Sequence, residues 1–311
     1  MGRGKLAEGC MVLALAFMAS LPVASAEEEA PQVQQRILDA EAALDAGQGE
    51  VAVGIYDELL AMTPDDPELL AQRGSAYCEL GQMDKAEADL AKALGIIPDA
   101  MHPNYYMGLV KFRQGNFSHA REYLGKALAL AKEGSERAAV QDVLGQILFY
   151  EGNYKGAEEQ FSAAISGQES YQAYSHRAFA RMKQGDDKGA EEDFSRLIAL
   201  YPDDAELYHQ RGICRGKQGK YNAALEDFSK AIGMEPENPA LYSDRGYTYA
   251  CKKDFSAAVE DYTKALELDP RYRLAYANRA AAYEKLGKKD LAKRDRELLE
   301  KLMEFEENGQ E

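Results

Sequence analysis

Apolar and small residues recur along the chain with a period of 34 residues. The pattern is clearest between Ala205 and Pro270, where AELYHQRGICRGKQGKYNAALEDFSKAIGMEPEN is followed directly by PALYSDRGYTYACKKDFSAAVEDYTKALELDPRY. Within each copy the apolar positions lie three or four residues apart, which is the spacing of one face of a helix. Each copy therefore predicts a pair of amphipathic helices joined by a short turn.

The two copies match at five positions, which hold an aromatic residue, Gly, Ala, an aromatic residue and Pro. The matching residues are Tyr208 and Tyr242, Gly212 and Gly246, Ala224 and Ala258, Phe228 and Tyr262, and Pro236 and Pro270. A 34-residue period with these residues at these positions resembles the tetratricopeptide repeat (TPR), a helix-turn-helix unit. The resemblance implies an all-α fold, a right-handed α-solenoid of about eight TPR units.

The same pattern can be followed through residues 33–305. It divides them into eight repeats, near 33–66, 67–100, 101–137, 138–170, 171–204, 205–238, 239–272 and 273–305. Position 8 of every repeat is Ala or Gly and position 20 is always Ala, as expected where two helices cross closely. Position 15 is Gly in seven repeats, which suits the end of a helix, and Lys253 in the other. The last helix reads as a C-terminal cap, followed by a polar tail at 306–311.

The first 26 residues have the pattern of a cleaved signal peptide. Arg3 and Lys5 precede a short apolar run, and the small residues Ala24-Ser25-Ala26 come just before three glutamates. The apolar run is too short to span a bilayer, so an uncleaved membrane anchor is the less favoured reading. We therefore expect an exported protein, periplasmic or secreted, with a leader at 27–32 and no direct membrane insertion after cleavage.

The chain is acidic, with a formal net charge of -16. Residues 27–110 alone hold 17 acidic and 4 basic residues. Such a surface repels phosphate backbones, so we expect no nucleic-acid partner. The excess of acidic residues in 27–110 is explained sufficiently by a need for solubility. The more specific alternative is that this region binds a basic partner.

Arginine and aspartate occur together at two positions of the repeat. Five repeats have Arg at position 7 and Asp at position 23, and the other three repeats have neither. The pairs are Arg73 and Asp89, Arg177 and Asp193, Arg211 and Asp227, Arg245 and Asp261, and Arg279 and Asp295. Because the two positions are equally far from the turn at position 15, we expect structural ion pairs within each hairpin. The alternative is that the arginines bind a carboxylate ligand.

No catalytic, cofactor or metal site is expected. The histidines His102, His119, His176 and His209 form no metal-binding motif. His176, His209 and Asp244 fall near one another on adjacent first helices and could form a metal site, which we call the metal corner. Because they supply fewer than four ligands, we interpret them as ordinary polar surface residues.

The three cysteines after residue 26 are scattered, so they do not predict a disulfide framework. They are Cys78, Cys214 and Cys251. Buried free thiols are the favoured reading, and whether Cys214 and Cys251 pair is left open.

The resemblance implies that the first helix of each repeat lines the concave side of the array. Positions 2, 5, 9 and 12 of that helix are left over from the hairpin contact, and several carry large apolar or aromatic groups. The resulting candidate groove consists of Tyr105, Leu109, Phe112, Phe149, Phe179, Met182, His209, Ile213 and Tyr247. A row of such groups is typical of a surface that binds a protein or peptide. The alternative is that neighbouring first helices bury these side chains among themselves.

The pattern known in this family for binding acidic C-termini is absent, since position 2 is never Lys. We therefore expect a non-enzymatic exported scaffold or adaptor that binds protein or peptide partners in its concave groove. The alternative function is a self-assembling structural component of an envelope or secretion complex. The oligomeric state does not follow from the sequence.

Overall fold

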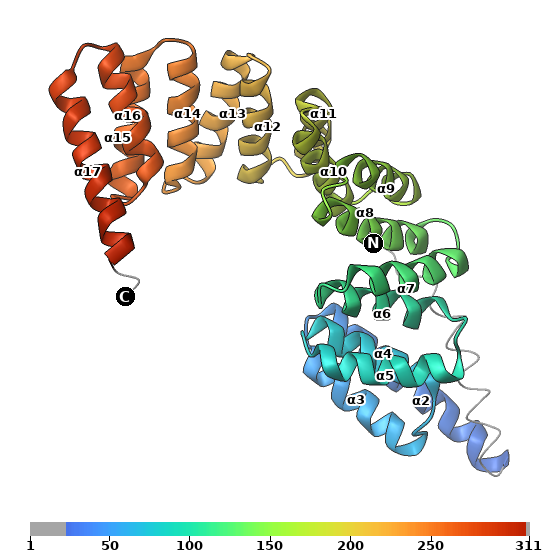
Figure 1. Ribbon diagram of the computed structural model, residues 1–311. Helices are drawn as coiled ribbons and strands as arrows, with labels where there is room; N and C mark the ends of the chain where they lie inside the picture. The colour runs from blue at the N-terminus through green and yellow to red at the C-terminus, as the bar shows by residue number, and fades with distance from the viewer. Residues whose placement is uncertain (1–22, 309–311) are drawn as a thin grey trace. The chain divides into compact units, whose positions relative to one another are not determined.

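The computed structural model describes residues 23–308, and the side chains of residues 31–304 (Figure 1). In this range the secondary structure consists of α-helices, which follow one another in antiparallel pairs. They are α2 (Val23–Asp45), α3 (Gly49–Met62), α4 (Pro67–Glu79), α5 (Met83–Ile96), α6 (Met101–Arg113), α7 (Phe117–Leu130), α8 (Ser135–Tyr150), α9 (Tyr154–Gly167), α10 (Tyr171–Gln184), α11 (Asp187–Leu200), α12 (Ala205–Lys217), α13 (Tyr221–Met234), α14 (Pro239–Cys251), α15 (Phe255–Leu268), α16 (Arg273–Lys285) and α17 (Lys289–Asn308). The predicted all-α solenoid of helix-turn-helix repeats is confirmed.

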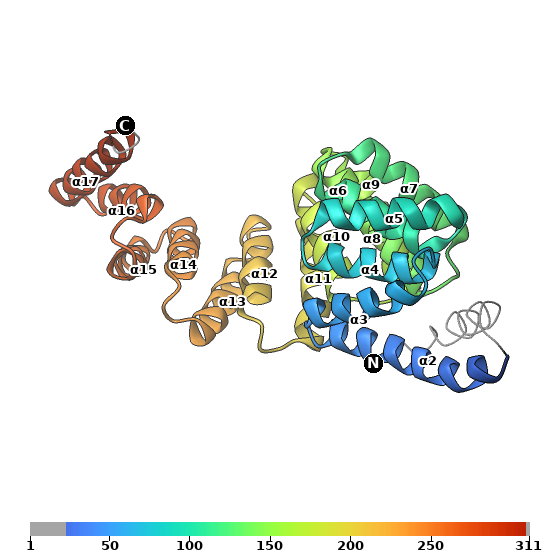
Figure 2. The same ribbon diagram turned by 90° about the horizontal axis from the view of Figure 1, so that it is seen from below.

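The helices form two compact bodies, which we describe separately. Within the described residues, the first body contains 23–147 and 166–168, and the second contains 148–165 and 169–308. In the second body, α12 to α17 stand next to one another in chain order, and both views place α17 beside α16 at one end of this row (Figures 1 and 2). Each helix therefore packs on the other helix of its own repeat and on helices of the adjacent repeats.

Aspartate and asparagine side chains start many of the helices. Asp66 accepts hydrogen bonds from the backbone N–H groups of Glu68 and Leu69 at the start of α4. Side-chain caps of the same kind begin five further helices, at Asn116, Asp186, Asp204, Asn238 and Asp254. Each cap satisfies a backbone donor that has no partner within its helix.

Each hairpin turns at a residue with a positive φ. The seven glycines expected at position 15 have φ between 72° and 81°. Lys253, at the same position of the seventh repeat, has φ 67°. The backbone N–H of Asp254 donates to the carbonyl of Tyr249, and the equivalent bond from Lys220 to Arg215 closes the turn at Gly219. Turn geometry is therefore conserved among the repeats even where Gly is replaced by a residue for which this conformation is strained.

Close packing inside each hairpin depends on the small residues at positions 8 and 20. The alanines at position 20 are at most 1% exposed. A Cβ added to Gly212 would lie 2.8 Å from the Phe228 ring, and one added to Gly108 would lie 2.6 Å from Leu124 Cγ. The core is thus a series of small residues on first helices facing large apolar residues on second helices.

The predicted signal peptide lies mostly outside the described residues. Residues 27–32, which we expected to form a leader, are part of α2 and continue into the first repeat without a break. Among the described helices, none combines the length and the apolar character needed to cross a membrane.

Candidate functional site

Each of the five arginines at position 7 binds the aspartate at position 23 of its own repeat through two parallel hydrogen bonds. Nε donates to Oδ2 and Nη2 donates to Oδ1. The N–O distances are 2.7 and 2.8 Å for Arg73–Asp89, 3.0 and 2.6 Å for Arg177–Asp193, 3.0 and 2.7 Å for Arg211–Asp227, 2.8 and 2.8 Å for Arg245–Asp261, and 2.8 and 2.8 Å for Arg279–Asp295. Charge-assisted pairs of this kind fix the two helices of a hairpin in one register.

The same arginines also reach the preceding repeat. Nη1 of Arg211 donates to Ser195 Oγ at 3.2 Å, and Nη1 of Arg245 donates to Ser229 Oγ at 3.1 Å. Equivalent bonds run from Arg73 to Asp57, from Arg177 to Ser162 and from Arg279 to Thr263. In the last four of these repeats the guanidinium also lies over the tyrosine at position 4, 5.4 to 5.7 Å from the ring centroid. Nε, Nη1 and Nη2 all donate within the protein, so the geometry favours a structural role over a carboxylate-binding one.

A second polar cluster joins consecutive repeats. Glu191 accepts hydrogen bonds from Arg215 Nε at 2.9 Å, Gln218 Nε2 at 2.9 Å and Lys220 Nζ at 2.7 Å. Burial by itself would raise the pKa of Glu191, but these three donors lower it to about 2. Glu158 is bound in the same way by Arg181 and Gln184, at 2.8 Å each. We call such a contact between consecutive repeats a seam.

Most of the residues expected to line a groove are partly buried between helices. Tyr105, Leu109 and Phe112 pack against the apolar cluster formed by α6, α7 and α8. Phe149 packs with Phe161 and Ala157, while Phe179 and Met182 pack on the cluster of α10 to α12. Ile213 is also partly buried, whereas Tyr247 is 59% exposed. Second helices of the same repeats and helices of the next repeats thus bury much of this row, whereas the alternative reading of the sequence expected neighbouring first helices alone to bury it.

A pocket of about 290 Å³ lies in the first body, on the face formed by first helices. We call it the first-helix pocket. Its lining residues come from α2, α4, α6, α7, α8 and the segments that precede α6 and α8, and they are Ile37, Glu68, Ala71, Gln72, Ile97, Ala100, Met101, His102, Pro103, Tyr106, Leu130, Lys132 and Glu136. None of the nine predicted groove residues lines it. Glu68 and Ala71 nevertheless occupy positions 2 and 5 of their repeat, so applying the predicted stripe to this repeat would have found them.

The electrostatics of the first-helix pocket centre on Glu68. Its carboxylate makes no hydrogen bond or ion pair with any described residue, and burial together with the charge of Asp66 raises its pKa. Glu136, on the opposite wall, accepts a hydrogen bond from the backbone N–H of Lys132 at 2.8 Å. An unpaired carboxylate beside apolar walls suits a ligand that brings a cationic group and an apolar group together.

At the suggested metal corner, one histidine makes a hydrogen bond to one carboxylate and an ion pair with another. His209 Nε2 lies 2.7 Å from Asp244 Oδ2, and Nδ1 lies 3.5 Å from Glu206 Oε2. His176 instead packs on the Phe161 ring at 5.3 Å. Among the described residues no cluster of three His, Cys, Asp or Glu side chains could hold a metal ion. Burial opposes the charged imidazole, yet the two carboxylates raise the pKa of His209 to about 9.

The three described cysteines are free thiols. Cys78 and Cys214 are buried and Cys251 is partly buried. Burial raises the pKa of the Cys214 thiol to about 12, which keeps it protonated at neutral pH. This matches the reading of buried thiols better than a reactive site.

Family models described as tetratricopeptide repeat match residues 43–111, 105–168, 143–205, 205–238 and 239–272. Together they run without a gap from 43 to 272. The chain belongs to the tetratricopeptide-repeat family. This TPR chain is also 23% identical over 149 residues to the small glutamine-rich tetratricopeptide repeat-containing protein 2 of Saccharomyces cerevisiae, which covers 48% of the chain. The chain spans 40% of the length of that curated relative.

Solved TPR structures share the fold. One is YrrB, described as a TPR protein with an unusual peptide-binding site, with a TM-score of 0.54 and 23% identity. That match covers 60% of this chain and 95% of YrrB. Another is the C-terminal part of a TPR repeat-containing protein from Cytophaga hutchinsonii, with a TM-score of 0.62 and 18% identity over 78% of this chain and 98% of that one. At these identities the likeness establishes the helical-repeat fold.

Proposed function

We propose that this TPR chain is an exported, non-enzymatic scaffold that binds a protein or peptide segment, with the first-helix pocket as its main anchoring point. The fold supports a scaffold because stacked repeats present long helical faces to a partner. The relatives support it as well, since YrrB is described as having a peptide-binding site. Export rests on the signal-peptide pattern of residues 1–26.

The observation that carries the proposal is the first-helix pocket itself. Its volume of about 290 Å³ accommodates one or two side chains of a bound segment, not a whole small domain. Apolar walls from Ile37, Ala71 and Met101 would hold an aliphatic or aromatic side chain. Glu68, whose carboxylate is otherwise unpaired, would bind a Lys or Arg next to it. The acidic balance of residues 27–110 would attract such a partner from solution.

Fluorescence polarisation with two labelled peptides tests this function. Both peptides are extended octapeptides with a central Leu, followed by Lys in one and by Glu in the other. We expect the Leu-Lys peptide to bind at least tenfold more tightly. Glu68→Gln should remove most of that preference, because it deletes the carboxylate and keeps the shape of the side chain.

Glu50→Gln is the matched control, since Glu50 lies exposed on α3 and outside the pocket. Equal binding of both peptides, or an equal loss with Glu50→Gln and Glu68→Gln, would contradict the proposed pocket. Export is checked separately by N-terminal sequencing of the protein from its producing cell, where we expect the first residue to be Glu27.

A further inference from the structure

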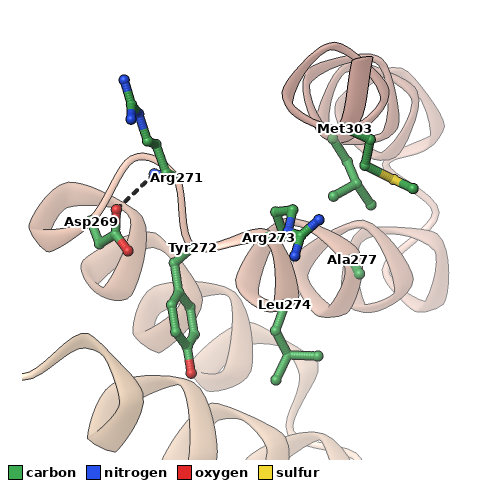
Figure 3. Close-up of a pocket in the computed structure, with 8 residues that line it drawn as sticks. Asp269, Arg271, Tyr272, Arg273, Leu274, Ala277 and Met303 are labelled. Carbon is green, nitrogen blue, oxygen red and sulfur yellow. Dashed lines mark hydrogen bonds between the residues drawn. The ribbon is translucent and has the colours of Figure 1, made fainter. Parts of the chain in front are cut away.

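A second pocket lies at the end of the second body, where α16 and α17 leave apolar side chains uncovered (Figure 3). Its volume is about 590 Å³, and its apolar lining includes Leu274, Ala277, Leu299 and Met303. Leu274 is 53% exposed and Met303 46% exposed. In the close-up, Met303 lies above Arg273 and Leu274 lies below it. No described residue covers this face.

This face of α17 differs from the same face of the other second helices. Position 24 holds a large apolar residue, at most 2% exposed, in the first seven repeats: Tyr56, Leu90, Leu124, Phe161, Phe194, Phe228 and Tyr262. In the last repeat it is Arg296, whose side chain is 50% exposed. Four residues later stands Glu300, which is also exposed. The surface of α17 is therefore unsuited to a further repeat of the same kind.

Charged residues on this face follow an ordered sequence. Lys293, Arg296, Glu300 and Glu304 lie three or four residues apart, so they share one side of α17 with two positive charges before two negative ones. This order opposes the helix dipole, which favours acidic groups at the start and basic groups at the end. It is also the weaker orientation for pairs within one helix.

The charges on this face are incompletely paired inside the chain. Glu300 and Glu304 make no ion pair with a described residue. Arg296 has an exposed partner in Glu284, and Lys293 lies 3.6 Å from Glu297. The two glutamates are thus available to a cationic partner.

We propose that this face binds a second copy of the chain, with the two α17 helices antiparallel about a two-fold axis that crosses this face midway between Arg296 and Glu300. This arrangement places Arg296 next to Glu300 of the partner subunit, and Lys293 next to Glu304 of the partner subunit. Because the contact is two-fold symmetric, each pair forms twice. It also covers Leu299 and Met303 of both copies, so apolar burial and charge complementarity act together.

A head-to-tail contact between copies is disfavoured by the same chemistry. At the seams, Arg at position 7 reaches position 25 of the preceding repeat, as Arg211 reaches Ser195. Stacking the first repeat of one copy on the last repeat of another would instead bring Asp39 to Glu297. Two carboxylates would meet where, at the seams within the chain, an arginine meets a hydroxyl or, for Arg73, the carboxylate of Asp57. The contact therefore closes as a dimer and does not grow into a filament.

Sedimentation velocity and light scattering of the purified protein over about 1 to 100 μM test this inference. We expect a dimer whose dissociation constant rises at least tenfold with Glu300→Arg and with Arg296→Glu. The double variant Arg296→Glu with Glu300→Arg should recover dimerisation, since it exchanges the signs on both copies. Met303→Glu should give a monomer with unchanged helical circular dichroism.

Lys301→Glu is the charge-matched control, because Lys301 lies about 100° around α17 from Glu300 and outside the row of four charges, and it should leave the dimer intact. A monomer throughout the concentration range would overturn the inference. So would a dimer that tolerates Met303→Glu and Glu300→Arg, or single variants that the double exchange does not rescue. None of these outcomes depends on peptide binding at the first-helix pocket.

Discussion

Arg211 and Asp227 face each other across one hairpin, with Nε 3.0 Å from Oδ2 and Nη2 2.7 Å from Oδ1. Asp227 is only 4% exposed, and it also accepts a hydrogen bond from Arg215 Nη1 at 2.8 Å. Asp227 thus binds two arginines of α12 and fixes the two helices of this repeat to each other. One of these arginines, Arg215, also makes the seam to Glu191 of the preceding repeat.

Arg211→Ala should lower the free energy of unfolding by about 2–4 kcal/mol, because it leaves a buried carboxylate with a single partner. Urea unfolding followed by circular dichroism measures the change. Arg196→Ala is the control, since Arg196 forms an ion pair with Glu169 in which both side chains are about half exposed. The control should cost much less, because solvent screens an exposed ion pair. Similar costs for the two variants would show that burial is not what gives the pair its strength.

The contribution of His209 to stability should disappear at alkaline pH. Its pKa of about 9 lies above the ordinary value of 6.5, so the stabilisation is complete below pH 6.5 and is lost as the pH rises through 9. His209→Gln should therefore cost roughly 1–3 kcal/mol at pH 6 and little at pH 10. Thermal unfolding of both proteins at several pH values tests this.

At low pH the carboxylates that face His209 also affect the measured stability. His209 holds the pKa of Glu206 below its ordinary value by hydrogen bonding, so part of the contact is also lost in acid. A pH-independent difference between the wild type and His209→Gln would contradict a charged histidine at this position.

Two glycine-to-alanine substitutions should have opposite effects. A Cβ at Gly108 would lie 2.6 Å from Leu124 Cγ, so Gly108→Ala should cost about 1–3 kcal/mol through overpacking. A Cβ at Gly54, in the interior of α3, meets nothing within 4 Å. Gly54→Ala should stabilise the protein by about 0.5–1 kcal/mol through helix propensity. Urea unfolding of both variants measures the contrast, and the same sign for both would refute the packing argument.

Lys253→Gly should stabilise the protein by about 0.5–1 kcal/mol. Lys253 has φ 67°, a conformation in which a side chain is strained and glycine is not. Gly219→Lys makes the reverse change at the equivalent turn, where φ is 75°, and should destabilise by about 1 kcal/mol. Hydrogen exchange of the flanking helices would localise each effect. Destabilisation by Lys253→Gly would mean that its side chain makes contacts that outweigh the strain.

The repeat architecture and the arginine–aspartate pairs could be predicted from the sequence because they depend on spacing within one hairpin. Positions 7 and 23 lie equally far from the turn, so their pairing needs no knowledge of the neighbouring repeats. The additional bond from Arg211 to Ser195 does depend on how repeats stack, and it was not predicted. The left-handed backbone at Lys253 was missed for a different reason, since lysine gives no local signal for it.

The candidate site was harder to predict because it depends on distances between repeats. The stripe rule picked out Tyr105 and Phe112 as large groups left over from the hairpin contact, but it could not show that α7 and α8 pack against them. Lys132 and Glu136 line the first-helix pocket from the segment before α8 and from its first turn, and the three extra residues of the third repeat lengthen α8 to 16 residues. An insertion of this kind breaks the 34-residue period, so the repeat pattern carries no information about where it folds.

The seams of the second body differ in chemical character. Glu158 and Glu191 make ionic seams, whereas the equivalent residues of the next two repeats are Leu225 and Val259, both partly buried. Dissolved salt weakens attraction between ions and, for ions such as sulfate, strengthens apolar association. The ionic strength of the solution therefore decides which seam opens first. In concentrated salt the seam at Glu191 should open more readily, while the seams of the last repeats stay closed.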